Sequence, residues 1–431
     1  MDFFHSKGGS LLCEEVPLRD VARGAGTPCF VYSRRTLELH YDRLVRAFEG
    51  VDVLPCFSVK ANSNLAVLDV LRRRGAGFDV VSGGELRRAL QVGADPRKIV
   101  FAGVGKTAEE MAAGLDAGIL AFNVESEGEL DLLERVAKAR RRRADVALRV
   151  NPDVDAKTHT YISTGKRESK FGIDLEAAAG LAASLPRRKR VRMTGVHAHI
   201  GSQITEVGPH AEAVKKAIRF AADARAMGNP VETLNMGGGF GVYYRGGEAR
   251  PAQEFGEVIV PLVKEAGLRL LLEPGRFIVG NAGVLLARVL YVKESGDRRF
   301  VVVDAAMNDL LRPALYGAHH RVWPVRAPFP ESEAGARESE TVLCDVVGPI
   351  CETADFLAKE RRLPPVEPGD LLCVFTAGAY GRVMSSNYNS RPRAAEVMVD
   401  GGRWQVVGER ETFADLVRGE RVLRGKRRGR R

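Results

Sequence analysis

Between Thr27 and Gly280, short apolar runs alternate with stretches of helical periodicity, and this alternation limits the possible folds more than any other feature of the chain. The alternation is typical of repeated β-α units, in which successive strands run parallel in one sheet. The expected strands lie at residues 54–58, 78–81, 98–101, 120–124, 145–150, 191–199, 231–236 and 269–273. The expected helices lie at residues 64–74, 83–92, 107–117, 126–140, 175–185, 209–226 and 252–266.

Eight parallel strands fit a TIM-like (β/α)8 barrel, whose active-site residues are carried by the loops at the C-terminal ends of the strands. An open, doubly wound sheet is the alternative architecture. That alternative usually carries a GxGxxG motif after its first strand, which this chain lacks, and it gathers its ligand-binding residues in one crevice. Here polar residues follow many strands, so the sequence predicts an α/β fold with a barrel domain at residues 27–280.

The sequence changes character after Gly280. Strand-like segments separated by Gly, Pro and charged turns predict a mostly β domain, a small barrel or sandwich, at residues 281–416. Residues 1–26 are too short to fold alone and are expected to add a strand to that domain. Residues 417–431 are rich in Arg and Gly and are expected to form a disordered basic tail.

Charge and cysteine usage narrow the possible partners and location. The formal net charge is +10, but residues 418–431 carry +7 of it, which leaves +3 on the rest of the chain. Two other basic clusters, at residues 138–143 and 187–192, lack interleaved aromatic residues, so we expect solvated surface and no nucleic-acid partner. The six scattered cysteines suggest reduced thiols in a cytoplasmic protein. No apolar run is long enough to suggest a membrane span or a secretion signal.

A lysine at the end of a buried strand is the first candidate for chemistry. The segment VLPCFSV (53–59) is apolar and strand-like, and Lys60 follows it directly. Desolvation by these neighbours would lower the pKa of Lys60 and make its amine a nucleophile for Schiff-base formation. The alternative is an ordinary surface lysine whose aliphatic stem covers the end of the strand.

A pair of histidines marks the end of a later strand. In VHAHIGSQ (196–203), the two-residue period of a strand puts His197 and His199 on one face. Such a pair can bind a metal ion, as in a metal-dependent barrel hydrolase, although the other histidines have no matching ligand spacing. The flat imidazole of His199 could instead stack on a ring.

Further segments suggest a phosphorylated aromatic ligand. The glycines at 237–239 follow an apolar strand, and their backbone N–H groups could cradle a phosphate, although such glycines also occur in turns that are simply tight. Glu273 ends the last barrel strand, where a buried carboxylate needs a cation such as a protonated pyridine nitrogen. Asp79 and Glu85, in FDVVSGGE (78–85), either belong to this site or cap the following helix.

Several motifs together resemble one family: SVKAN at 58–62, HIGSQ at 199–203, GGGFG at 237–241, EPGR at 273–276, MNDLLRPALYGAHH at 307–320, GPICE at 348–352 and AGAYG at 377–381. In combination they resemble the fold-type III, alanine-racemase-like pyridoxal-phosphate decarboxylases. MNDLLRPALY, YISTG with KFGI (161–165, 170–173) and SSNYNSRP (385–392) look like the diaminopimelate decarboxylase branch more than the ornithine or arginine decarboxylases. The similarity extends from residue 10 to residue 416.

The resemblance implies a role for each matching residue. Lys60 would bind pyridoxal phosphate covalently, His199 would stack on its ring, and Glu273 would pair with the ring nitrogen. We group with them, as cofactor-binding residues, Asp79, Ser202, Gly239, Gly275, Arg276 and Tyr380. The implied substrate-binding residues are Arg276, Arg312, Tyr316, Glu352 and Tyr380, and the implied proton donor is Cys351, with the freed Lys60 as the alternative.

The resemblance also implies a reaction and an assembly. Cys351, Glu352 and Tyr380 would reach the active site of a partner subunit, so the working unit would be a homodimer with composite sites. The implied reaction is decarboxylation of meso-2,6-diaminopimelate to L-lysine and CO2, the last step of lysine biosynthesis, without a metal. Decarboxylation of ornithine, arginine or a carboxylated polyamine is the alternative on the same fold. A catalytically silent homologue is a further alternative, which the intact Lys60 and Cys351 disfavour.

Overall fold

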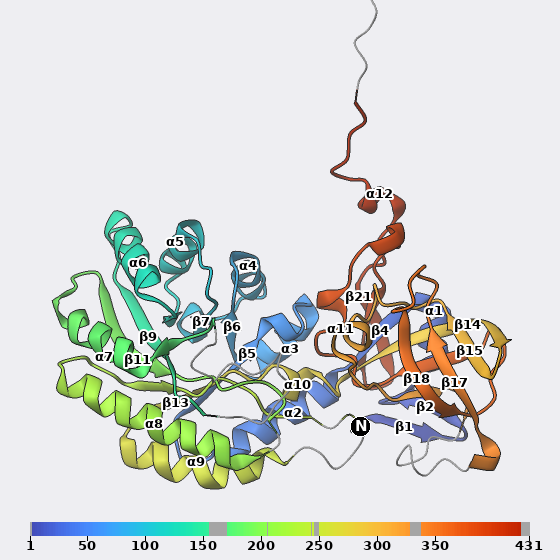
Figure 1. The fold of residues 1–431 in the computed structure, drawn as a ribbon, viewed down its shortest axis with the longest axis horizontal. Coiled ribbons are helices and arrows are strands. Elements are labelled where there is room, and N and C mark those ends of the chain that lie inside the picture. Colours follow the sequence, from blue (N-terminus) through green and yellow to red (C-terminus); the bar gives the residue numbers. More distant parts are fainter. Residues whose placement is uncertain are drawn as a thin grey trace, which may run out of the picture.

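The computed structural model describes residues 2–154, 170–204, 206–242, 244, 250–327 and 338–423. The chain forms a barrel domain and a β domain that lie side by side (Figure 1). One continuous cluster of buried apolar residues runs through both domains, from Phe4 to Val399. The motif YISTG at 161–165 and residues 424–431 of the predicted tail fall outside the described residues.

The barrel is a closed ring of parallel strands. Around the ring the strands follow chain order, and β13 pairs with β5 to close it. The ring consists of β5 (Val53–Ser58), β6 (Gly77–Val80), β7 (Ile99–Phe101), β8 (Ala121–Val124), β9 (Ala144–Asn151), β11 (Val191–His197), β12 (Thr233–Asn235) and β13 (Arg269–Leu272). A short strand, β10 (Ile173–Asp174), pairs with β9 outside the ring. The predicted TIM-like barrel is confirmed, and the open sheet is excluded.

Helices cover the outside of the ring (Figure 1). The predicted helices are present as α3 (Leu65–Arg73), α4 (Gly83–Gln91), α5 (Ala108–Ala117), α6 (Glu127–Ala139), α7 (Leu175–Ser184), α8 (Val207–Ala226) and α9 (Ala252–Ala266). Helix α2 (Arg34–Ala47) was not predicted. Most of these helices begin at a polar side chain that accepts a hydrogen bond from the first turn, namely Ser33, Asn64, Ser82, Thr107, Ser126 and Asp174.

The β domain is built around a mixed sheet with the strand order β18-β17-β15-β14-β4-β20-β21. Its strands are β4 (Cys29–Ser33), β14 (Gly283–Ser295), β15 (Arg298–Val303), β17 (Val342–Val347), β18 (Phe356–Leu363), β20 (Ala395–Asp400) and β21 (Arg403–Gly408). Two more strands, β16 (Val322–Pro324) and β19 (Leu371–Val374), join this sheet through β14. Strand β4 falls inside the range predicted for the barrel, yet it pairs with β14 and β20.

The first residues of the chain pack with the β domain. Strands β1 (Phe4–Lys7), β2 (Ser10–Cys13) and β3 (Val16–Pro17) form a small sheet of their own, followed by α1 (Leu18–Ala25). The backbone N–H of Leu11 donates to the carbonyl of Val325 over 2.9 Å, and the carboxylate of Glu14 accepts from the N–H of Gly401 over 2.6 Å. The N-terminal segment therefore contributes to the β domain by docking onto it.

The loop after β5 is tied to the β domain. The backbone N–H of Tyr380 donates to the carbonyl of Ala61 over 2.8 Å, and the side-chain amide of Asn62 donates to the carbonyl of Gly378 over 3.1 Å. The side-chain amide of Asn64 adds a bond to Val407. The C-terminal end of this barrel strand is thereby held against the AGAYG segment of the β domain.

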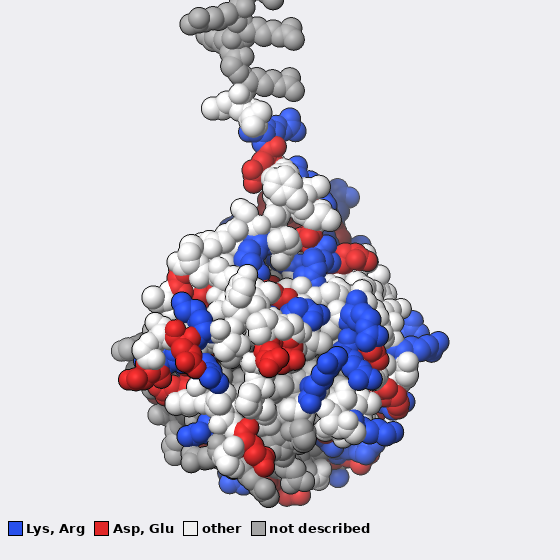
Figure 2. Space-filling view, turned by 90° about the vertical axis from the view of Figure 1, so that its right-hand side faces the viewer, with Lys and Arg blue, Asp and Glu red and all other residues white. Residues whose placement is uncertain are grey.

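The surface seen from the β-domain end carries mixed charge. Figure 2 shows Lys and Arg side chains interspersed with Asp and Glu across this face, without a large patch of either sign. Within the described ranges, no helix combines the length and the apolar character that crossing a lipid bilayer requires.

Candidate active site

Lys60 lies where strand β5 ends. It belongs to the 3-10 turn Val59–Ala61, and its Nζ atom donates a 2.7 Å hydrogen bond to Oδ2 of Asp79. Asp79 is close because β6 pairs with β5 in a register that sets it opposite Ser58. The Asp79 side chain is fully buried, whereas 39% of the Lys60 side chain is exposed. The end of the barrel therefore carries a half-buried amine paired with a buried carboxylate.

The pKa of Lys60 is raised, so the prediction of a lowered pKa is wrong. Burial alone would lower this pKa, but the negative charges of Asp79 and Glu273 outweigh burial. The apolar neighbours in β5 can be read from the local sequence, but the carboxylate of Asp79 comes from the next strand, β6. The amine is consequently a charged ammonium group at neutral pH, and it needs a proton acceptor before it can act as a nucleophile.

Asp79 is a site residue and not a helix cap. Its Oδ2 atom also accepts a 2.8 Å hydrogen bond from the hydroxyl of Ser58, and burial together with the charge of Glu273 raises its pKa. Helix α4 is capped by Ser82, and the carboxylate of Glu85 accepts a 2.8 Å bond from the N–H of Val81. Of the two carboxylates in FDVVSGGE, only Asp79 reaches Lys60.

Glu273 follows strand β13 and is held by three other strands. Its Oε1 atom accepts hydrogen bonds from the amides of Asn123 (3.0 Å) and Asn235 (2.7 Å), and its Oε2 atom lies 3.3 Å from Nε2 of His197. Burial would raise the pKa of this carboxyl, but His197 and Lys60 lower it further than burial raises it. Glu273 therefore stays ionised and fixed in one orientation.

Two asparagines and one histidine around Glu273 have roles that the sequence did not predict. Asn123 and Asn235 stand at the ends of apolar strands, in AFNV and TLN, and both are buried. A polar residue at such a position was the signal that led to Glu273 and Asp79, so the same rule would have found both amides. His197 had been paired with His199 as a possible metal site. It points instead to Glu273, and no metal-binding group of three His, Cys, Asp or Glu residues is found in the part of the chain that the structure describes.

The glycine-rich loop after β12 is packed so tightly that side chains are excluded. A Cβ atom on Gly238 would lie 2.2 Å from the carbonyl oxygen of Glu273, and one on Gly239, whose φ is 97°, would lie 2.6 Å from that of Gly201. A Cβ atom on Gly275 would come within 3.0 Å of Ala61. The backbone of these loops therefore lines the pocket directly, as a phosphate cradle requires.

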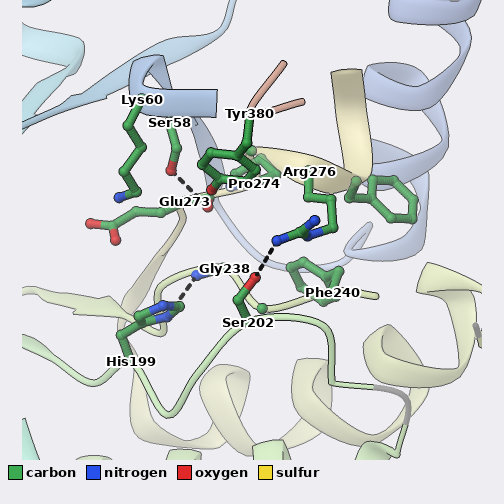
Figure 3. A pocket seen from close by; sticks show the side chains of 13 residues that line it. Ser58, Lys60, His199, Ser202, Gly238, Phe240, Glu273, Pro274, Arg276 and Tyr380 are labelled. Atoms are coloured by element: carbon green, nitrogen blue, oxygen red, sulfur yellow. Dashed lines mark hydrogen bonds between the residues drawn. The ribbon is translucent and has the colours of Figure 1, made fainter. Parts of the chain in front are cut away.

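A hydroxyl and a guanidinium group lie beside this cradle (Figure 3). Arg276 begins the short helix α10 (Arg276–Val279), is buried, and donates from Nη2 to the hydroxyl of Ser202 over 3.4 Å. The ring of Tyr380 lies 4.9 Å from the guanidinium carbon of Arg276. Tyr380 thus lines the pocket of its own chain, and the expectation that it reaches a partner's site is wrong. The bond from its backbone to Ala61 holds it there.

His199 lies across the pocket from Lys60 (Figure 3). Its Nδ1 atom accepts a 3.3 Å hydrogen bond from the N–H of Gly238. Burial, assisted by the positive charge of Arg149, lowers its pKa well below the usual value. The ring is therefore neutral, which suits stacking on a flat ligand better than ion pairing.

Together these residues fit pyridoxal phosphate. The pocket offers an amine for an aldehyde, a neutral ring to stack on, an ionised carboxylate for a ring nitrogen, and a glycine cradle with a hydroxyl and an arginine for a phosphate. The Nε atom of Arg276 and Oδ1 of Asp79 are buried without a hydrogen-bond partner among the described residues. Buried polar atoms without a hydrogen-bond partner are rare in protein interiors, so these two indicate that a polar ligand completes the site.

A second buried arginine extends the site away from the amine. Arg312 begins helix α11 (Arg312–Tyr316), and its Nη1 atom donates to Nε2 of His320 over 2.9 Å. The ring of Tyr244 lies 5.0 Å from the Arg312 guanidinium, and the Tyr244 hydroxyl accepts a 2.5 Å bond from Arg276. Tyr316, at the other end of α11, is half-buried. Tyr244 therefore links two cations, and it was not predicted.

Cys351 and Glu352 do not join the pocket within a single chain. They lie in the exposed loop between β17 and β18, and neither is among the described residues that line the pocket around Lys60. The hydroxyl of Tyr388 donates to Glu352, and the side-chain amide of Asn389 lies 3.3 Å from the sulfur of Cys351. The structure thus brings together the predicted cofactor-binding residues and leaves this pair facing outward.

Comparisons with known proteins agree with this description. Residues 34–280 match the family model "Pyridoxal-dependent decarboxylase, pyridoxal binding domain". The chain is 49% identical to the diaminopimelate decarboxylase of Pseudomonas aeruginosa, over 98% of this chain and 100% of that protein. It is 42% identical to the diaminopimelate decarboxylase of Aquifex aeolicus, over 96% of both chains.

Solved structures give the same result for the fold. The diaminopimelate decarboxylase of Helicobacter pylori complexed with L-lysine aligns with a TM-score of 0.87 and 38% identity, over 93% of this chain and 98% of that one. The enzyme of M. jannaschii, also in complex with L-lysine, aligns with a TM-score of 0.91 and 36% identity, over 98% of both chains. The chain therefore belongs to the pyridoxal-dependent decarboxylase family, and within that family to the diaminopimelate decarboxylases.

Proposed function

We propose that this chain decarboxylates meso-2,6-diaminopimelate to L-lysine and CO2, the last step of lysine biosynthesis. The observation that carries the proposal is the meeting of Lys60, Asp79 and the ionised Glu273 at one end of the barrel, beside a glycine cradle and two buried arginines. The relatives that match over nearly the whole chain bear the name of this activity, and three of the matching structures contain L-lysine.

The residues that would hold the cofactor surround the pocket. Lys60 would attach it, with Asp79 close to the amine. The others would be His199, Ser202, Gly239, Glu273, Gly275, Arg276 and Tyr380. Bound pyridoxal phosphate supplies an aldehyde for covalent attachment and a conjugated ring that accepts the electron pair released when CO2 leaves.

Glu273 acts by holding a proton at the ring nitrogen of the cofactor. A carboxylate whose pKa is lowered by its neighbours keeps its negative charge, and that charge favours a protonated nitrogen beside it. Asn123 and Asn235 fix the carboxylate from two other strands, so it cannot rotate away. Asp79, whose pKa is raised, is suited to take the proton that Lys60 must lose before it can act as a nucleophile.

The two arginines bind carboxylate groups of the substrate. Neither Arg276 nor Arg312 has a carboxylate partner among the described residues, and each keeps a buried Nε atom without a hydrogen-bond acceptor. A guanidinium group can bind a carboxylate through two parallel hydrogen bonds. Tyr316 lies on the same short helix as Arg312. A substrate with a second amino-acid centre fits these cations better than ornithine, arginine or a carboxylated polyamine does.

The catalytic unit is a homodimer with composite sites. Cys351 and Glu352 are exposed on their own chain, where a partner's pocket could receive them. In that arrangement Glu352 binds the distal ammonium group of the substrate, and Cys351 protonates the carbon that has lost CO2. The variants Lys60→Ala and Cys351→Ala should each be much slower than the wild type, and mixing them should restore activity through mixed dimers. Sedimentation of the wild-type chain as a monomer would contradict this assembly.

Substrate and cofactor can be tested together. The purified protein should absorb near ~420 nm, and Lys60→Ala should lose this band. Release of CO2 should be fast from meso-diaminopimelate and slow from ornithine and arginine. Faster turnover of ornithine or arginine would favour the alternative function. The six free cysteines, five of them buried, suit a cytoplasmic location, which fractionation of the source cells would test.

A further inference from the structure

The segment SSNYNSRP (385–392) has no role in the mechanism above, yet it contacts both members of the exposed pair. The Nδ2 atom of Asn389 donates to the sulfur of Cys351 over 3.3 Å. The hydroxyl of the preceding residue, Tyr388, donates to Oε1 of Glu352. We propose that Asn389 and Tyr388 are positioning residues, the first for the proton donor Cys351 and the second for the substrate-binding Glu352. The inference rests on the function proposed above.

The loop that carries Cys351 is fixed at its base. The carboxylate of Asp355 accepts a 2.6 Å bond from the N–H of Ile350 and a 2.7 Å bond from the N–H of Met307. These bonds close the turn on both sides of Cys351 and Glu352 and tie it to the neighbouring segment. The backbone of the pair is therefore held in place by the β domain.

The segment that carries Asn389 is fixed as well. The amide of Asn387 donates to the carbonyl of Arg391 over 3.1 Å and to the carboxylate of Glu411. The second bond ties the segment to the residues that follow strand β21. The side chain of Arg391 donates to the carbonyl of Asp304 over 2.5 Å. Asn389 and Tyr388 thus project from a rigid base toward the pair.

The backbone at Asn389 is shaped for this contact. Asn389 has φ 54° and ψ 29°, and Ser390 has φ 52°, so two consecutive residues adopt the left-handed conformation. Only Gly, Asn and Asp adopt that conformation at low cost. Of these three, only Asn also supplies an N–H donor. Asn389 therefore meets two requirements of this turn. It tolerates the left-handed backbone, and its side-chain amide can donate a hydrogen bond to the sulfur of Cys351.

The direction of this hydrogen bond matters for the proton transfer. Because the amide nitrogen only donates, the sulfur of Cys351 acts as acceptor and its own S–H hydrogen remains free. The electron pair that the C–C bond releases when CO2 leaves is stabilised by the bound cofactor and then forms the new bond at the substrate carbon. The S–H bond then breaks and a C–H bond forms at that carbon, which leaves a thiolate stabilised by the N–H of Asn389. Solvent returns the proton to the thiolate.

The first test uses Asn389→Asp, which keeps the size and the left-handed conformation but replaces the donor by an acceptor. Turnover of meso-diaminopimelate in D2O should place deuterium at the decarboxylated carbon with one configuration in the wild type and with both configurations in the variant.

A second readout of the same variant is the reactivity of the thiol. In the cofactor-free dimer, a small alkylating agent should label Cys351 about tenfold more slowly in the variant, because the carboxylate disfavours the thiolate. The other five cysteines are buried and do not interfere.

The second test separates Tyr388 from Asn389. Tyr388→Phe should raise the KM for meso-diaminopimelate about tenfold, the effect of losing one hydrogen bond to a charged group, and leave the configuration of the product unchanged. Ser390→Asn, in the same turn, is the matched control and should change neither readout.

Two results would overturn the inference. The role of Asn389 is refuted if Asn389→Asp gives product of a single configuration and normal alkylation while Cys351→Ser scrambles the configuration. If Cys351→Ser also gives a single configuration, Cys351 is not the proton donor, and the function proposed for that residue fails as well.

Discussion

The Nζ atom of Lys60 lies 2.7 Å from Oδ2 of Asp79, and this ion pair joins the ends of two adjacent barrel strands. Burial lowers the pKa of a lysine, so the pair with Asp79 and the nearby charge of Glu273 account for the raised value. The amine is thus held in its charged form until the site is loaded.

Replacement of Asp79 should reverse this effect. In cofactor-free protein, Asp79→Asn should lower the pKa of Lys60 by at least about one unit, since burial is then opposed by Glu273 alone. The measurement is peptide-resolved acetylation of Lys60 as a function of pH. An unchanged midpoint would contradict the ion pair, and Glu110→Gln, which alters the capping box of helix α5, serves as the control.

Replacement of Glu273 should affect chemistry more than cofactor binding. Glu273→Gln removes the charge that favours a protonated ring nitrogen, so kcat should fall about 100-fold, within the range typical of lost proton catalysis. The absorption band near ~420 nm should persist, because Lys60 and the phosphate cradle are intact. Steady-state kinetics and a spectrum of the same preparation test this, and a variant with wild-type kcat would refute it.

A methyl group on the phosphate cradle should not be tolerated. In Gly238→Ala the new Cβ atom would lie 2.2 Å from the carbonyl oxygen of Glu273, so the loop must move. We expect a loss of about 2 kcal/mol in the free energy of unfolding and weaker retention of the cofactor. Urea unfolding and cofactor titration measure both. Gly128→Ala in helix α6 meets no atom within 4 Å and should be neutral or slightly stabilising.

The stability of the barrel should depend on pH through His210. Burial is the main cause that lowers the pKa of this histidine from its usual 6.5 to about 4, while its Nε2 atom donates to the carbonyl of Gly238 over 3.1 Å. The unfolded chain therefore binds more protons between pH 6.5 and pH 4. The contribution of neutral His210 to the free energy of unfolding is therefore complete above pH 6.5, and it is lost as the pH falls toward 4.

This dependence can be measured against a variant that does not titrate. Urea unfolding should give the wild type about 2 kcal/mol less stability at pH 5 than at pH 7 from this residue. His210→Gln keeps a donor for Gly238 and should reduce the difference between the two pH values by that amount. An identical difference in both proteins would show that His210 does not carry the effect.

The barrel could be predicted because each of its strands is an apolar run that a helix separates from the next. Helix α2 was missed because it follows β4, a strand that belongs to the other domain and so does not fit the barrel's repeat. Lys60 and Glu273 were found because each follows an apolar strand, and Arg276 was found through the family resemblance; the structure brings these three into one pocket.

The features that were predicted wrongly or not at all depend on contacts between residues that are distant in sequence. The charge state of Lys60 depends on Asp79, nineteen residues away, and the orientation of Glu273 depends on Asn123, which is 150 residues away. Tyr244 bridges Arg276 and Arg312 although no local pattern marks it. The sequence periodicity reports which residues share a strand face, but it does not report which side chains meet across the ring.

The position of β4 in the second sheet determines an order of assembly during translation. A ribosome releases β4 early, but its neighbours β14 and β20 begin only at Gly283 and Ala395. The last strand of the ring, β13, ends at Leu272. The barrel can therefore close before the two strands that pair with β4 have been synthesised. Until both have been synthesised, the buried apolar strand β4 lacks the two neighbours that satisfy its backbone hydrogen bonds in the folded protein.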